Sequence, residues 1–88
     1  MSLAIRYSKK FEKQFKKLSP RVKEQFIERQ ALYETDSYNP LLRVHPLSGK
    51  YQGYYSLDVN GDVRALFERQ GSTLIIFGFI GTHSQLYG

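Results

Sequence analysis

The spacing of apolar residues changes half-way along this chain, from a helical period to a strand period. Phe11, Phe15 and Leu18 recur every three or four residues, as on one face of an amphipathic helix. In the second half, apolar side chains instead alternate with polar ones, as Tyr55 and Leu57 do, which is typical of half-buried strands. Helical segments followed by a run of strands predict an α+β fold.

Turn and capping residues set the bounds of the expected elements. Ser8 and Ser19 are suited to cap two helices, because a serine hydroxyl accepts a hydrogen bond from a backbone N–H of the first turn. The expected elements are a strand over Leu3–Tyr7, a helix from Ser8 to Leu18, a helix over Pro20–Tyr33, and strands over Tyr54–Val59, Asp62–Arg69 and Thr73–Ile80. The segment 41–47 is expected to be extended, because a residue that precedes proline is biased away from helix, and residues 81–88 are expected to form a tail.

The dipeptide Asn60-Gly61 predicts a hairpin and fixes the register expected across it. A three-residue loop over Val59–Gly61, with Gly61 at positive φ, places Leu57 opposite Val63 and keeps apolar side chains on one face. The face expected to pack under the helices carries Tyr55, Leu57, Val63, Ala65 and Phe67. The opposite face, named here the polar face, carries Tyr54, Ser56, Asp58, Asp62, Arg64, Leu66 and Glu68. Its polar and aromatic character makes it the candidate functional surface.

The last strand, Thr73–Ile80, is nearly all apolar, which predicts a central strand that is buried on both faces. A three-residue loop at Gln70–Ser72 would place Gly78 beside Arg64 on the preceding strand. A glycine at that position would leave room for a ligand next to the guanidinium.

The whole chain has a formal net charge of +5 and a sequence pI of about 9.6, and its basic residues are concentrated in the first quarter. They are Arg6, Lys9, Lys10, Lys13, Lys16, Lys17, Arg21 and Lys23, with Glu12 as the only acidic residue among them. A concentrated positive field attracts polyanions and speeds their encounter. Nucleic acid, an acidic protein and a membrane surface are therefore candidate partners, beside the plainer interpretation of a solvated helix face.

The length and the residue types present exclude several classes of protein. The 88 residues suffice for one domain (1–88) with one modest core. The absence of cysteine excludes disulfides, and together with the lack of a long apolar stretch at Met1–Ala4 it favours a cytoplasmic protein. No apolar run is long enough to cross a bilayer, and no Gly-rich phosphate loop, zinc-ligand spacing or serine nucleophile elbow is present. Asp58 and Asp62 alone do not make a metal-ligand set, so no metal or other cofactor is expected.

Two longer motifs give the sequence a family resemblance. They are His45-Pro46-Leu47-Ser48-Gly49 and the terminal Gly81-Thr82-His83-Ser84-Gln85-Leu86-Tyr87-Gly88. The opening Tyr7-Ser8-Lys9-Lys10-Phe11, the pair Gly53-Tyr54 and the strand residues Asp62-Val63-Arg64 accompany them. Over nearly the whole chain, the sequence resembles the RelE/ParE toxin superfamily, and most of all its YafQ-like branch.

The resemblance implies a single RelE-like domain in which two N-terminal helices pack on a four-stranded, mainly antiparallel sheet. It also implies the toxin of a type II toxin–antitoxin system, which is an endoribonuclease that cuts messenger RNA at the ribosomal A site without a metal or small-molecule cofactor. The implied partners are a cognate antitoxin, mRNA and the ribosome, and no membrane. Two other functions stay open: a ParE-like binder that inhibits a DNA topoisomerase, and a non-catalytic relative that acts through antitoxin binding.

The candidate catalytic residues combine this resemblance with the chemistry of RNA cleavage. Metal-free cleavage uses the 2′-hydroxyl as nucleophile and needs a base, an acid and positive charge on the phosphorane. His45, Asp62 and His83 fall where YafQ-like toxins carry functional residues, and Arg64 resembles the strand arginine of RelE-type toxins. We expect His83 to act as general acid or base, with Asp62 orienting it or holding an RNA group. His45 is a second acid–base candidate or an RNA contact, and Arg64 is expected to bind phosphate.

Further side chains are expected to bind RNA rather than react with it, because aromatic rings stack on bases and cations contact the backbone. They are Lys50, Arg43, Tyr54, Tyr87 and Asp58. Ser56 and Asp58 stand where the YafQ-like branch has an aspartate and a histidine, so two functional side chains of that branch are altered. Plainer interpretations are partly buried tyrosines, histidines bound to the backbone, and a cross-strand ion pair of Arg64 with Asp58, Asp62 or Glu68.

Overall fold

The computed structural model describes residues 3–88 and contains a mixed five-stranded sheet. Its strands are β1 (Ala4–Tyr7), β2 (His45–Pro46), β3 (Tyr55–Asp58), β4 (Val63–Gln70) and β5 (Leu74–Thr82), in the order β1-β5-β4-β3-β2. Neighbouring strands are antiparallel, except that β1 runs parallel to β5. The predicted α+β class is confirmed. The sheet has five strands rather than four, because His45 and Pro46 pair with Ser56 and Tyr55 at one edge.

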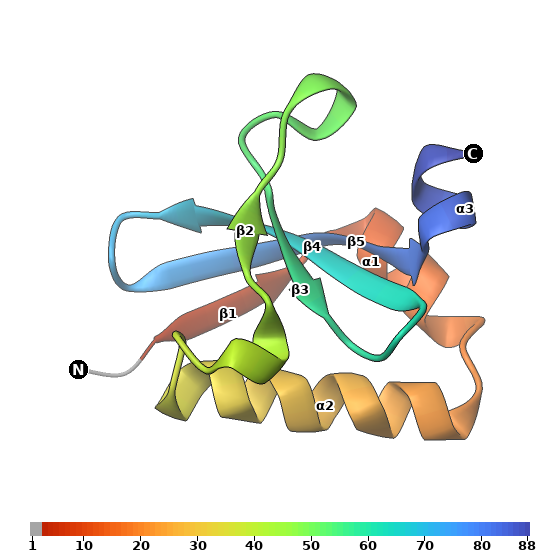
Figure 1. Cartoon of the computed structure of the whole chain (residues 1–88), viewed down its shortest axis with the longest axis horizontal. Helices are drawn as coiled ribbons and strands as arrows, with labels where there is room; N and C mark the ends of the chain where they lie inside the picture. Colours follow the sequence, from red (N-terminus) through yellow and green to blue (C-terminus); the bar gives the residue numbers. More distant parts are fainter. Residues whose placement is uncertain (1–2) are drawn as a thin grey trace.

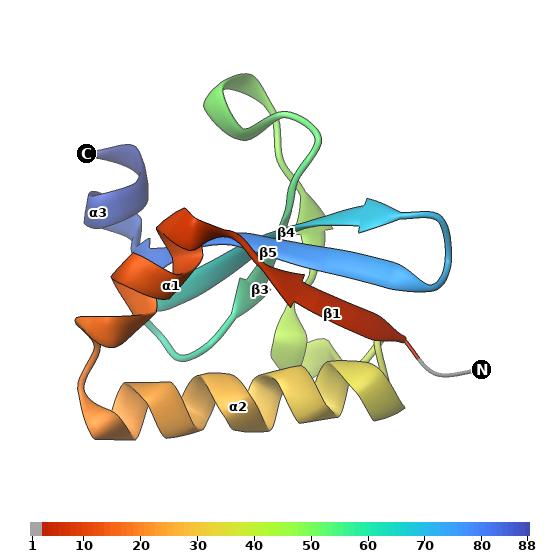
Figure 2. The same cartoon turned by 180° about the vertical axis from the view of Figure 1, so that it is seen from behind.

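Two long helices and several short ones surround this sheet. The predicted N-terminal helices are present as α1 (Lys9–Lys16) and α2 (Pro20–Thr35). The one-turn 3-10 helices η1 (Pro40–Leu42) and η2 (Gly49–Tyr51), and the helix α3 (His83–Tyr87), come later in the chain. In both views α2 lies along one side of the sheet, whereas η2 and α3 rise from the opposite side (Figures 1 and 2).

Serine caps begin both long helices, as the sequence predicts. Ser8 Oγ accepts a hydrogen bond from Phe11 N at 3.0 Å, and Ser19 Oγ accepts one from Val22 N at 3.3 Å. The Ser8 hydroxyl also donates to the Gly78 carbonyl at 2.8 Å. This bond fixes the start of α1 beside the part of β5 that β1 does not reach.

The segment 41–47 is extended only in part, because η1 occupies its start. Asn39 Oδ1 accepts a hydrogen bond from Leu41 N at 2.9 Å and caps this turn. Arg43 ends the turn in the left-handed conformation, with φ of 48°. Only His45 and Pro46 form strand β2.

The tail predicted at residues 81–88 is wrong, because β5 runs to Thr82 and α3 follows directly. Thr82 Oγ1 accepts from Gln85 N at 3.1 Å, and Gln85 Oε1 accepts from Thr82 N at 2.9 Å. These two bonds form a capping box, whose sequence signature is a threonine followed three residues later by glutamine. The signal was therefore in the sequence, although the segment carries too few apolar residues to show a helical period.

The hairpin between β3 and β4 has the predicted loop length in a different register. The loop is Asn60–Asp62 rather than Val59–Gly61, so Leu57 lies opposite Ala65 and not opposite Val63. The cause is the Asn60 side chain, whose Oδ1 accepts from Asp62 N and Val63 N, both at 2.8 Å, and closes the turn without a positive φ at Gly61. The pairing moves by two positions, which leaves every side chain on its predicted face.

A β-bulge at Gly78 interrupts the pairing of β4 with β5. Phe67 pairs with Phe77, whereas Leu66 pairs with Phe79, so Gly78 is an extra residue on β5. The prediction that Gly78 lies beside Arg64 is therefore wrong; Gly81 occupies that place. The loop before β5 is also one residue later than expected, with Gly71 at φ of 66°.

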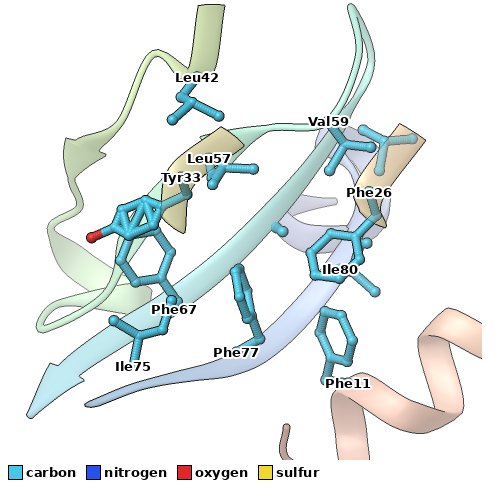
Figure 3. Close-up of a cluster of buried hydrophobic side chains, with 12 residues drawn as sticks. Phe11, Phe26, Tyr33, Leu42, Leu57, Val59, Phe67, Ile75, Phe77 and Ile80 are labelled. Atoms are coloured by element: carbon cyan, nitrogen blue, oxygen red, sulfur yellow. The ribbon is translucent and has the colours of Figure 1, made fainter. Parts of the chain in front are cut away.

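The main core lies between the sheet and helices α1 and α2 (Figure 3). Its centre is aromatic, with the Phe77 ring 5.7, 5.1 and 5.4 Å from the rings of Phe11, Phe26 and Phe67. The predicted core residues of β3 and β4 in this cluster are Leu57, Val63, Ala65 and Phe67, with Tyr55 packed against it. A smaller cluster on the polar face contains Tyr51, Leu66 and Leu86.

Candidate active site

A cross-strand ion pair lies on the polar face. Asp58 of β3 is directly opposite Arg64 of β4, and Arg64 Nε is 3.0 Å from Asp58 Oδ1. Arg43 approaches the same carboxylate from the end of η1, with Nε 3.7 Å from Oδ2. The side chains of Asp58 and Arg64 are 14% and 26% exposed, so water and salt screen this pair less than a surface ion pair. The Asp58 carboxylate, which was expected to bind RNA, is thus engaged by two guanidinium groups.

The hairpin loop also binds the Arg64 guanidinium. Nη1 donates to the carbonyls of Asn60 at 2.7 Å and Val63 at 3.2 Å, and Nη2 donates to Gly61 O at 3.4 Å. Asn60 in turn donates from Nδ2 to Gln25 Oε1 of α2 at 2.8 Å. Arg64 is therefore held in one orientation at the hairpin end of the polar face. Asn60 was predicted only as a turn residue, and its contact with Arg64 was not predicted.

His45 lies on the edge strand β2, opposite Ser56 of β3. Directly opposite residues of an antiparallel pair project to the same side, which places His45 on the polar face. Its Nδ1 is 2.9 Å from Arg43 O, and because a carbonyl oxygen only accepts, Nδ1 carries the hydrogen in this bond. When the ring is neutral, Nε2 has a free lone pair that can accept a proton or a hydrogen bond.

His83 lies just beyond the end of strand β5, at the hairpin end of the sheet. Gly81 pairs with Arg64, and His83, two residues later, is the first residue of α3. The imidazole is exposed, and its ring lies 4.7 Å from the ring of Tyr87 one turn further along the helix. His83 therefore combines access to solvent with an aromatic neighbour on which a base can also stack.

Contacts with η2 hold α3 on the polar face. Leu86 is 1% exposed and packs with Tyr51 and Leu66. The Leu86 carbonyl accepts from Tyr51 Oη at 2.7 Å and from Lys50 Nζ at 3.2 Å. Lys50, which was expected to contact the RNA backbone, is therefore also part of the scaffold that fixes α3.

The two flanks of α3 face different neighbours. Successive helical residues are about 100° apart, so His83 and Tyr87 lie on one flank of α3 and Gln85 lies on the other, with Leu86 between them. A Cβ added at Gly81 would lie 2.9 Å from Gln85 Oε1, which shows that Gln85 covers β5 at this point. Gln85 also accepts from an N–H on the outer edge of β5, so His83 lies on the flank of α3 that faces away from this contact.

Two tyrosines near this site have phenol groups with altered acidity. Burial raises the pKa of Tyr54 above its ordinary value, and the nearby Glu68 carboxylate raises it further. Burial likewise raises the pKa of Tyr87, with a smaller contribution from Tyr51. Both phenols therefore remain neutral at physiological pH and can donate hydrogen bonds.

The structure brings most of the predicted residues to one surface without making a single compact cluster. Asp58, Arg64 and Arg43 are in direct contact, and His83 follows Gly81, which pairs with Arg64. Four other predicted residues lie outside these contacts. His45 is at the outer edge of the sheet, Asp62 is exposed in the hairpin loop, Lys50 is within η2, and Tyr54 follows η2 along the chain.

Over residues 3–88, no three or more His, Cys, Asp or Glu side chains are grouped so as to hold a metal ion. None of the helices described is long and apolar enough to cross a membrane.

The chain was compared with models of known protein families. The family model described as the bacterial toxin of type II toxin–antitoxin systems, YafQ, matches residues 3–88. The chain belongs to the YafQ toxin family. The resemblance to YafQ-like toxins is thus confirmed, and the chain is a toxin of the type II toxin–antitoxin class.

Solved structures share the YafQ fold over nearly their whole length. The E. coli DinJ-YafQ toxin–antitoxin complex matches with 25% identity and a TM-score of 0.81, covering 100% of both chains. YafQ from E. coli strain BL21(DE3) matches with 24% identity and a TM-score of 0.81, covering 98% of this chain and 99% of the other. The RelBE2 complex of Mycobacterium tuberculosis matches with 17% identity and a TM-score of 0.69, over 94% and 100% of the chains. The comparison with curated protein sequences finds no match.

Proposed function

We propose that this YafQ-family toxin is a metal-independent endoribonuclease that cuts mRNA at the ribosomal A site. The observation that supports the proposal is the strand register, in which Gly81 pairs with Arg64 of the Arg64–Asp58 ion pair and His83 begins α3 two residues later. An imidazole and a guanidinium on one surface provide the proton transfer and the positive charge that phosphodiester cleavage requires.

RNA supplies its own nucleophile in this reaction. A base removes the proton of the 2′-hydroxyl, the 2′-oxygen forms a bond to phosphorus, and the bond from phosphorus to the 5′-oxygen breaks. An acid gives a proton to that 5′-oxygen, which leaves a 2′,3′-cyclic phosphate and a 5′-hydroxyl. We assign His83 as one of the two proton-transfer groups. His45 is the candidate for the other, because its Nδ1–H is bound to a carbonyl and Nε2 is free.

The two arginines on Asp58 are suited to different parts of this reaction. Arg64 is the candidate that stabilises the phosphorane, since planar guanidinium donors match phosphate oxygens. In the free protein its donors are bound by Asp58 and by hairpin carbonyls, so the phosphate must exchange with some of these contacts. Arg43 is 76% exposed and is the more accessible cation for the first contact with the RNA backbone.

The proposed protein partner is a cognate antitoxin. Two of the similar structures, DinJ-YafQ and RelBE2, are toxin–antitoxin complexes. The net charge of +5 and the lysine-rich α1 favour an acidic partner, and the same positive field favours the RNA-rich ribosome.

The test compares His83→Ala with Ser84→Ala, its exposed neighbour on α3. His83→Ala should reduce cleavage of translated mRNA at least about 100-fold, since proton transfer by a positioned group contributes at least that much. Primer extension measures the cleavage, and circular dichroism and antitoxin titration should show an unchanged fold and unchanged antitoxin affinity. Ser84→Ala should cleave as the unaltered chain does.

Three outcomes would contradict the proposal. Growth inhibition that survives His83→Ala, with mRNA uncut and DNA supercoiling lost, would indicate a topoisomerase-inhibiting binder. An unaltered chain that binds antitoxin but cuts no mRNA would indicate a non-catalytic relative. Full cleavage by His83→Ala would show that His83 is not one of the acid–base groups.

A further inference from the structure

A pocket of about 370 Å³ opens between α1, η2 and α3, on the flank of α3 that carries Gln85. Its wall is aromatic, because the ring of Phe79 lies 5.1 Å from that of Tyr51 and 5.5 Å from that of Tyr54, both in edge-on geometry. The volume lies within the range of small-ligand sites. The proposed cleavage chemistry, on the opposite flank of α3, makes no use of this pocket.

Two glutamine amides on the pocket wall are held in fixed orientations. Gln14 of α1 accepts at Oε1 from Ile80 N, and Gln85 of α3 accepts at Oε1 from Thr82 N, each at 2.9 Å. These N–H groups belong to the outer edge of β5, beyond the point where β1 ends. Because each Oε1 is bound to the strand, the NH₂ group of each amide is the donor available to a ligand in the pocket that these side chains line.

Two lysines add positive charge to the same pocket. Lys10 and Lys50 line it, and Lys50 Nζ is 5.3 Å from the centre of the Tyr51 ring and 3.2 Å from Leu86 O. None of the described residues that line the pocket is acidic. The pocket therefore suits a ligand that has a flat aromatic surface, several hydrogen-bond acceptors and a negative charge.

We propose that this pocket binds one unpaired nucleotide of the RNA, with its base against the aromatic wall, its acceptor edge on the two glutamine amides and its phosphate at the lysines. Unstacked bases are commonly recognised through aromatic stacking and edge hydrogen bonds. Guanine fits the two donors best, because its O6 and N7 both accept, whereas adenine has a donor amino group in place of O6. This inference rests on the proposed ribonuclease function and deepens it, since a base read across α3 from His83 would set where the strand is cut.

The binding test adds GMP, AMP or ribose 5-phosphate to the folded chain and measures the affinity of each by NMR titration. GMP should bind more tightly than AMP and should shift resonances of Tyr54 and Phe79. Gln14→Glu and Gln85→Glu each keep an oxygen for the β5 edge but replace the donor by an acceptor, so each should weaken GMP binding at least about tenfold. Gln70→Glu, on the exposed end of β4, is the matched control and should bind GMP normally.

A second pair of variants tests the contribution of the lysines. Lys10→Gln should weaken binding of GMP and of ribose 5-phosphate alike, because both carry the phosphate. Lys13→Gln, on α1 but outside the pocket, should change neither. Equal losses in the two variants would show a diffuse effect of net charge and overturn the assignment of the phosphate position.

Cleavage mapping separates this inference from the proposed function. Gln14→Glu and Gln85→Glu should still cut mRNA while the base preference at one fixed position changes, and His83→Ala should still bind GMP. Equal affinity for GMP and AMP, or normal GMP binding by both glutamate variants, would overturn the pocket proposal and leave the ribonuclease standing. GMP binding by a chain that cuts no RNA would overturn the ribonuclease proposal and leave the pocket as a nucleotide-binding site. Loss of antitoxin affinity in these variants, with GMP binding unchanged, would assign the pocket to the protein partner instead.

Discussion

The two faces of the sheet differ in what they bury. On the helix side, twelve buried residues among those described form one apolar cluster centred on tilted and edge-on phenylalanine rings. On the polar face, the cluster formed by the described residues has three buried members, and the same face carries the Asp58–Arg64 ion pair. Strand alternation makes this possible, because Val63 and Ala65 belong to the main core while Arg64, between them, faces the other way. Most of the stability can therefore come from one face and the chemistry from the other.

The same comparison bears on one expected departure from the YafQ-like branch. Asp58, which the resemblance aligns with a histidine of that branch, pairs across the ladder with Arg64. The two residues form one ion pair on the face that contributes little to the core. A substitution of this kind changes the charge pattern of the site and leaves the packing of the helices untouched.

The largest expected effect compares two phenylalanines on either side of the Gly78 bulge. Phe77→Ala should reduce the free energy of unfolding by about 3–5 kcal/mol, because it leaves a cavity in the main core. Phe79→Ala should cost clearly less, because Phe79 is only partly buried on the polar face. Urea unfolding followed by circular dichroism measures both, and equal losses would show that the two faces contribute alike.

A second prediction concerns the attachment of α3. Leu86→Ala should release this helix at a cost of about 2–4 kcal/mol, while the main core stays folded. Hydrogen exchange should then quicken in α3 and not in β4, and RNA cleavage should fall because His83 is displaced. Uniformly faster exchange across the sheet would mean that the small cluster supports the whole fold.

Replacing Arg64 should separate activity from stability. Arg64→Ala should cost about 1–3 kcal/mol of stability, because it leaves the largely buried Asp58 carboxylate with only the longer contact to Arg43. It should slow mRNA cleavage more than it weakens ribosome binding, whereas Arg43→Ala should chiefly weaken binding. Single-turnover rates and sedimentation with ribosomes provide the two measurements. Equal losses of rate and binding in Arg64→Ala would count against a role in the transition state.

The smallest expected effect is an alkaline loosening of the polar face. Burial raises the pKa of Tyr54 and Tyr87 above the ordinary value of 10.0. A group with a raised folded pKa contributes its stability in full below the unfolded pKa and loses it as the pH rises through the folded value. The protection of α3 amides, taken relative to the intrinsic exchange rate at each pH, should therefore fall above about pH 10. Tyr54→Phe and Tyr87→Phe should reduce this effect, and Tyr7→Phe, whose pKa burial also raises, is the control on another surface. An identical pH response in all three variants would contradict the assignment.

The parts of the fold that depend on local signals could be predicted from the sequence. The serine caps of α1 and α2 and the faces of β3 and β4 follow from capping chemistry and from alternation. The register could not, because it depends on the Asn60 side chain closing the turn one residue later. The bulge at Gly78 was also not predictable, since the surrounding strand is apolar at every position and gives no period to follow.

The candidate site divides in the same way. The side chains with suitable chemistry could be named from residue type and resemblance, and the cross-strand ion pair of Arg64 with Asp58 was among the alternatives and is confirmed. Gln14 was missed because no local signal shows that its amide would bind the free edge of β5, whereas Gln85 was missed although its spacing from Thr82 is that of a capping box. Groups whose role depends on segments distant in sequence lie beyond what the pattern alone can indicate.

Strand β5 lies between β4 and β1, so the sheet is complete only when Ala4 meets Leu74, which is distant from it along the chain. Pairings so distant along the chain close late and make folding slower than in proteins dominated by local contacts. A cut in the connection between α2 and β2 would therefore yield two fragments, neither of which contains a finished sheet. We expect the toxin to gain and lose its structure as one unit, and a protease that opens that connection should inactivate it in a single step.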